Sequence, residues 1–183
     1  MLRNIGLFAS AALLALCTSV AAEEIDNEEY KLWAKFKAGS WVTYKQVSDA
    51  GGTKSEMEMT HKVLENTGDK IVIETSTKMN MNGQVMDLGA QKRDIPAKVK
   101  KPEQTGDQPE NKPKEGSEEI EVDGKKLKCK TWESTLDNAG TKTTSKTWMC
   151  DDIPGGLAKM ESSSTGQMSS KMTMVAAKWE ATN

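Results

Sequence analysis

Beyond Gly39, apolar and polar residues alternate along the chain with a period of two. The clearest stretch is 55–64, where Met57, Met59 and Val63 alternate with charged or hydroxyl side chains. Such alternation is typical of a β-strand with one apolar and one solvated face. Turn-forming residues separate similar stretches, so we predict antiparallel strands over 40–48, 55–64, 70–79, 84–93, 119–122, 127–134, 143–150, 157–162 and 171–179.

A different period marks the segment just before Gly39. Tyr30, Trp33 and Phe36 recur every three residues after Asp26, a residue suited to capping a helix. We therefore predict one short amphipathic helix that starts at Asp26 and ends before Gly39. Because a short helix is stable only when its apolar face is docked, its aromatic side chains are expected to pack on the sheet.

The predicted hairpin over 127–150 carries Cys129 and Cys150. If Asp137 opposes Lys142 across the turn, the two cysteines also oppose each other. Opposed residues lie about 5 Å apart at Cα, which is within the range of a disulfide. This register therefore predicts a bridge between Cys129 and Cys150.

A different turn would change that register. A three-residue loop with Gly140 in the left-handed conformation pairs Cys129 with Met149, which excludes the bridge unless a bulge intervenes. The first register instead places Trp148 on the face of the cysteines and Trp132 on the opposite face. The sequence leaves both registers open.

The first 22 residues have the composition of a secretory signal peptide. One basic residue precedes the apolar run 5–16, and small residues lead to Ala22. We predict cleavage near Ala22 and an exported protein, periplasmic or extracellular, in a compartment that favours disulfides. A lipoprotein signal would lipidate Cys17, but Leu16 stands where that motif has a small residue.

Residues 23–183 are enough for a single β-rich domain. Within it, 96–117 holds four of the five prolines among lysines and glutamates, and we predict a disordered loop insertion there. The net charge of −2 argues against a nucleic-acid binder. The apolar run near the N-terminus is too short to span a bilayer and has no long counterpart, so no transmembrane segment is predicted.

Catalytic chemistry finds little support in the sequence. His61 is the only histidine, and it stands in a predicted strand without a nucleophile motif nearby. Neither a glycine-rich phosphate loop nor a metal-ligand spacing of Cys and His occurs. We therefore predict a protein that is not an enzyme and needs no cofactor or metal ion.

Methionine is the one unusual component of the composition, with 11 residues. Three Met-x-Met pairs, at 57 and 59, 79 and 81, and 172 and 174, each put two thioethers on one strand face. With His61, they suit Cu(I), which is a third functional hypothesis. The alternative is that methionines fill an irregular β-core.

The exit from the hairpin, Lys146 to Lys159, carries a tryptophan-bearing strand, an acidic turn, a proline and a further strand. It resembles a pattern in uncharacterised exported bacterial domains similar to the outer-membrane lipoprotein carriers of the LolA/LolB type. The resemblance implies a single curved antiparallel sheet, an incomplete β-barrel, with one short N-terminal helix packed across it.

In such a half-barrel, one strand face lines the concave side and the helix aromatics form a lid. The predicted ligand-binding residues are Trp33, Phe36, Met57, Met59, Ile71 and Ile73. We predict a non-catalytic module that binds an apolar or lipid-like ligand. An envelope structural or protein-interaction module without a small ligand is the alternative, and a protein partner is not identified by the sequence.

Overall fold

The computed structural model describes residues 23–183 except 82, 102–111, 139, 167–168 and 183. The predicted signal peptide, with Cys17, lies outside the described residues. The described chain is mainly β, with one short helix. Its elements are β1 (Glu24–Asp26), α1 (Glu28–Trp33), β2 (Trp41–Ala50), β3 (Thr53–Asn66), β4 (Lys70–Met81), β5 (Gln84–Pro96), β6 (Lys98–Lys100), β7 (Lys114–Val122), β8 (Lys125–Asn138), β9 (Thr141–Met149), β10 (Leu157–Thr165) and β11 (Ser170–Glu180).

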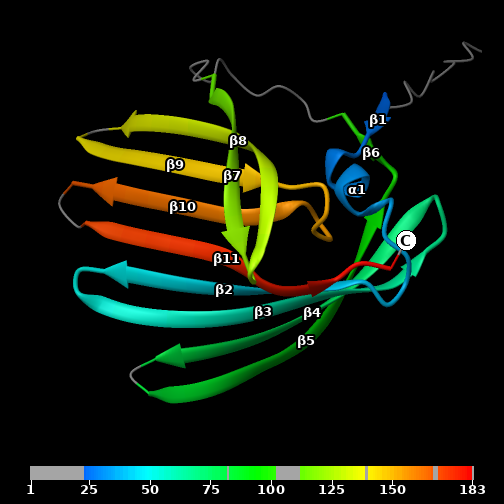
Figure 1. Cartoon of the computed structure of the whole chain (residues 1–183), viewed down its shortest axis with the longest axis horizontal. Helices are drawn as coiled ribbons and strands as arrows, with labels where there is room; N and C mark the ends of the chain where they lie inside the picture. The colour runs from blue at the N-terminus through cyan, green and yellow to red at the C-terminus, as the bar shows by residue number, and fades with distance from the viewer. Residues whose placement is uncertain (1–22, 82, 102–111, 139, 167–168, 183) are drawn as a thin grey trace, which may run out of the picture.

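Nine of the strands form one antiparallel sheet in the order β5-β4-β3-β2-β11-β10-β9-β8-β7 (Figure 1). All neighbours in this order are consecutive in the chain except β2 and β11, which join its two halves. The sheet is not closed, since β5 and β7 are its edges. A second, small sheet pairs β1 with β6. No helix in the described part of the chain is long and apolar enough to cross a membrane.

The predicted meander is confirmed, and so is the first of the two hairpin registers. Asp137 opposes Lys142 across a two-residue turn, and Thr131 opposes Trp148. Trp132 lies on the opposite face from Trp148, as that register requires.

The helix is shorter than predicted. Its N-cap is Asn27, whose side chain accepts a hydrogen bond from the Glu29 amide, because Asp26 is already paired within β1. It ends at Trp33. The Asn66 side chain donates to the carbonyl oxygens of residues 34 and 36, which in a longer helix would accept hydrogen bonds from later backbone amides. Phe36 therefore lies in the turn that follows the helix.

The boundaries predicted for the disordered insertion, 96–117, are too wide. Strand β6 and the first half of β7 lie inside it. Each is held by a partner that the local composition does not reveal, β1 for β6 and β8 for β7. The central part, 102–111, lies outside the described residues.

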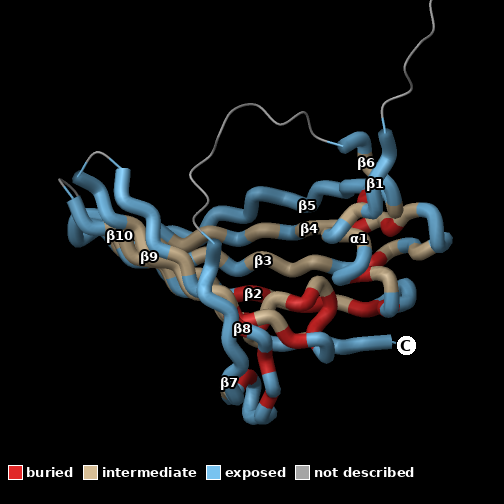
Figure 2. Tube along the Cα trace, turned by 90° about the horizontal axis from the view of Figure 1, so that it is seen from above, coloured by how far each residue is buried: buried red, intermediate tan, exposed pale blue. Residues whose placement is uncertain are grey.

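The buried residues gather at one end of the large sheet, around α1 and the bases of β7 and β8 (Figure 2). Toward the hairpin turns at the other end, the tube in Figure 2 is exposed or intermediate along its whole length. The core therefore supports only part of the sheet. The buried hydrophobic residues are Trp33, Phe36, Val42, Tyr44, Val63, Ile71, Ile73, Ile95, Val122, Leu127, Cys129, Trp148, Cys150, Ile153, Ala158 and Ala176.

Candidate functional site

Directly opposed residues of neighbouring strands place their side chains on the same face of a sheet. Met57 of β3 opposes Met79 of β4 on one side and Gln46 of β2 on the other. The same rule extends the row outward, because Met79 opposes Met86 of β5. On the other half of the sheet, Gln46 opposes Met174 of β11.

This row runs across eight strands and contains five methionines. In sheet order it is Met86, Met79, Met57, Gln46, Met174, Met160, Thr147 and Trp132. Met59, Met81 and Met172 lie on the same face, two residues along their strands from members of the row. We call this side of the nine-stranded sheet the methionine face.

No charged residue of the described strands lies on the methionine face between this row and the hairpin turns. The residues between the methionines are serine, threonine, glutamine and similar uncharged side chains. None of the row is buried, and its member Met86 is 43% exposed; Met81, two residues from the row on β4, is 40% exposed. In the described chain, the part of this face between the row and the hairpin turns is therefore uncharged, partly apolar and open to solvent.

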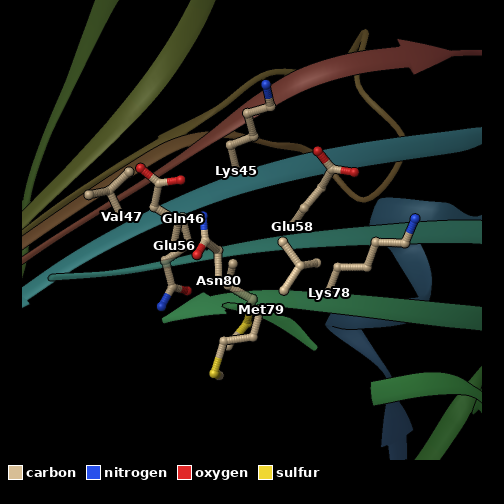
Figure 3. A pocket seen from close by; sticks show the side chains of 10 residues that line it. Lys45, Gln46, Val47, Glu56, Glu58, Lys78, Met79 and Asn80 are labelled. Carbon is tan, nitrogen blue, oxygen red and sulfur yellow. The ribbon is translucent and has the colours of Figure 1, made fainter. Parts of the chain in front are cut away.

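The opposite face of the same strands is charged. Lys45, Glu58 and Lys78 oppose one another in series and point to the side away from Met79 (Figure 3). A shallow open hollow of about 430 Å³ is lined mainly by side chains of this face, and also by Gln46, Met57 and Met79. Its two lysines and two glutamates are exposed, which is the ordinary composition of a solvated strand face. This hollow is not our candidate site.

His61 lies where the methionine face meets the buried core. Its ring is edge-on to Trp33 of α1, with ring centroids 6.2 Å apart, and to Tyr44 of β2 at 5.6 Å. Its Nδ1 is hydrogen-bonded to Thr75 Oγ1 at 2.7 Å. Burial, with the nearby Arg93 guanidinium, holds the pKa of His61 below its ordinary value. The imidazole at this end of the methionine face is therefore neutral at neutral pH.

The structure separates the predicted ligand-binding residues into two groups. Trp33, Phe36, Ile71 and Ile73 are buried in the core. Met57 and Met59 lie on the same face as the two isoleucines but toward the open end of the sheet.

Met86, Met160, Met174 and Trp132 belong to the site, but the sequence analysis did not select them. The Met-x-Met pattern pointed to one of them, Met174, without connecting it to β3. Only the register across β2 and β11 brings the two halves of the row together.

Metal ligation by the usual side chains has no support in the described residues, which contain no cluster of three or more His, Cys, Asp or Glu able to hold an ion. Thioethers are a different class of ligand. The methionine face is thus the part of the molecule with distinctive chemistry.

The cysteine pair lies on the charged side of the sheet, with Cys129 on β8 and Cys150 directly after β9. Lys130 opposes Met149, and continuing that register by one residue brings Cys129 opposite Cys150. Both are buried free thiols in the structure. Burial, together with the neighbouring Cys150 thiol, raises the pKa of the Cys129 thiol, so it is protonated at neutral pH.

If the protein is exported, as its first 22 residues predict, we expect these two thiols to be oxidised to a disulfide. A bridge that closes a loop of about twenty residues should add roughly 3 kcal/mol to the free energy of unfolding. Thiol counting in denaturant, without reductant, tests this on protein secreted by its own host. Two reactive thiols per chain would contradict the expectation.

Comparison with family models, with curated proteins and with solved structures found no match for this chain. Any functional conclusion therefore rests on the chemistry of the chain itself.

Proposed function

We propose that this protein is an exported, non-catalytic binder of a single apolar or lipid-like chain, which lies across the methionine face. The observation that carries the proposal is the row of five methionines, together with the absence of charged residues between this row and the hairpin turns on the same face of the described strands. Methionine side chains are unbranched and flexible, so they adapt to a flexible ligand. Trp132 adds a large, half-buried ring on β8, and Glu115 of the edge strand β7 opposes it.

The charged face shows how the same strands are built where they meet water. On the charged face, Lys and Glu form cross-strand pairs. On the methionine face of the same strands, the cross-strand pair Met57 and Met79 carries thioethers instead. Apolar surface on this scale at an open face is typical of an interaction site. A chain that removed about 300 Å² of it from water would gain roughly 7 kcal/mol before the costs of association. We therefore expect affinity in the micromolar range or weaker.

The proposal includes a half-barrel in which α1 closes one end of the ligand site. Its support is that Trp33, the only buried residue of α1, contacts His61 at the inner end of the methionine face. The resemblance to carriers of the LolA/LolB type agrees with this arrangement. The buried aromatics then act as an end wall, and the methionines hold the ligand.

The test is binding of a fluorescent fatty acid to the full mature protein. Changing Met57 and Met174 to threonine keeps residues that favour strands but makes the centre of the row polar. This double variant should bind about tenfold more weakly or worse, since it loses apolar contact at two sites of the row, one on either side of Gln46. Changing the same pair to leucine should preserve binding.

Val47→Thr is the matched control, because Val47 lies on β2, on the charged face, and is 46% exposed. It should bind like the unmodified protein. Absence of saturable binding, or equal binding by the threonine pair, would remove the carrier hypothesis.

The second candidate function is a protein-interaction module of the cell envelope. The observation in its favour is the edge strand β5, where Val85, Met86 and Leu88 are 70%, 43% and 53% exposed. An exposed strand edge can pair with a strand of another chain. Failure of fatty-acid binding would favour this function.

A further inference from the structure

Three neighbouring strands at one side of the methionine face each contribute a methionine at the same level. Met57 of β3 is paired directly opposite Met79 of β4, and Met79 is paired directly opposite Met86 of β5. Met59 and Met81 follow two residues further along β3 and β4, on the same face. Five thioethers are thus concentrated on three adjacent strands.

The spacing of these strands suits a shared ligand. Neighbouring strands lie about 4.8 Å apart, so Met57 and Met86 flank Met79 at roughly that distance on either side. Each methionine has three rotatable side-chain bonds, which lets the outer two lean over the middle one. All three side chains are exposed or intermediate, so an ion can reach them from solvent.

The chemistry of this donor set is selective. Thioether sulfur is a neutral, soft ligand that favours Cu(I), whereas Mg²⁺ and Ca²⁺ require charged or carbonyl oxygens. The carboxylates of β3 and β4 lie on the opposite face of the sheet. We propose that Met57, Met79 and Met86 form a three-coordinate Cu(I) site, which we call the thioether trio.

The other half of the sheet provides a natural comparison. There Met160 and Met174 oppose each other, but their neighbours in the row are Thr147 and Gln46. That half has two opposed thioethers where the trio has three. Cu(I) should therefore bind first and more tightly at the trio.

The proposal predicts binding that does not depend on pH. Ligands such as cysteine and histidine must lose a proton before they bind a metal, so their affinity falls as the pH is lowered. Thioethers carry no such proton. The affinity for Cu(I) should stay constant between pH 7 and pH 5, apart from any change in the competitor.

The experiment is an anaerobic titration of the full mature protein with Cu(I) against a competing chelator at both pH values. One equivalent should bind at the trio. Changing all three of its methionines to leucine should weaken this binding by more than about tenfold, the scale on which metal sites respond to altered ligation. The matched control, Met160→Leu with Met174→Leu, should retain it.

Three results would overturn the proposal. The first is an equal Cu(I) affinity of the trio variant and the unmodified protein, and the second is an equal loss in the trio variant and the control. The third is an affinity that falls about tenfold per pH unit, which would indicate a protonatable ligand such as His61 on the same face or the cysteines on the opposite face. Leucine keeps the surface apolar, so fatty-acid binding by the same variant remains a separate readout of the proposed function.

Discussion

Replacing Gly155 with alanine should lower the free energy of unfolding by about 2–5 kcal/mol. Gly155 has φ +78°, a left-handed conformation that costs a residue with a side chain roughly 1–2 kcal/mol. A Cβ atom there would also lie 2.4 Å from Cζ2 of Trp33 and 2.7 Å from its Cε2. Displacing a buried ring from a packed core adds roughly 1–3 kcal/mol. Equilibrium unfolding in urea measures the sum.

Gly124→Ala is the matched control for the backbone cost. Gly124 also has positive φ, +70°, but its Cβ would meet nothing within 4 Å. We expect this variant to lose only the conformational part, roughly 1–2 kcal/mol. Equal losses in the two variants would show that the Trp33 ring accommodates a methyl group at position 155 without cost, which would contradict close packing between this turn and Trp33.

This contact explains how so short a helix is held in place. Trp33 is the only buried residue of α1, and its ring lies between the turn at Gly155 and the His61 ring. The same turn carries Pro154, whose carbonyl oxygen accepts a hydrogen bond from the Tyr44 hydroxyl at 3.5 Å. Through Gly155 and Pro154, this turn therefore contacts both Trp33 of the helix and Tyr44 of the sheet, at the inner end of the methionine face.

The strands could be predicted from the sequence because alternation reports side-chain orientation directly. It correctly placed Met57 and Met59 on one face with Ile71 and Ile73. It could not tell which end of the face is covered, because a buried strand segment and an exposed one share the same period of two. The position of α1 and of the turn near Gly155 decides that.

The full methionine row could not be predicted, for a different reason. Each Met-x-Met pair fixes orientation within one strand, but a row needs the register of seven strand pairs. One-residue slips would move each strand's set to the opposite face. The critical pair, Gln46 with Met174, joins residues 128 positions apart through β2 and β11. No local signal specifies that contact.

Trp148→Ala should cost about 3–5 kcal/mol of unfolding free energy, the usual loss for a buried tryptophan. Trp148 is 4% exposed, and the ammonium groups of Lys146 and Lys159 each lie 4.9 Å from its ring centroid. Its indole Nε1 donates to Glu118 Oε2 at 2.8 Å, and Lys146 donates to Oε1 of the same carboxylate at 2.5 Å. The hydrogen bond from Lys146, followed by that from Trp148, holds the pKa of Glu118 below its ordinary value.

This cluster connects three strands, because Glu118 lies on β7, Trp148 on β9 and Lys159 on β10. Among the described strands, β7 is an edge strand that pairs with β8 alone, so its contact with Trp148 is a second attachment. Trp148→Phe keeps a ring between the two ammonium groups but removes the indole donor. We expect it to lose roughly 1–2 kcal/mol, less than alanine and more than a neutral change.

Trp132→Ala is the matched control, since Trp132 lies on the same hairpin but on the open methionine face and is only half-buried. Its loss should be about 1 kcal/mol or less, as for other residues outside the core. Urea unfolding of the three variants gives the order Trp148→Ala, Trp148→Phe, Trp132→Ala in decreasing loss. If the two alanine variants lost the same amount, the cluster around Glu118 would have no special part in holding β7. A large loss confined to Trp148 would instead show that the charged side of the hairpin carries its stability.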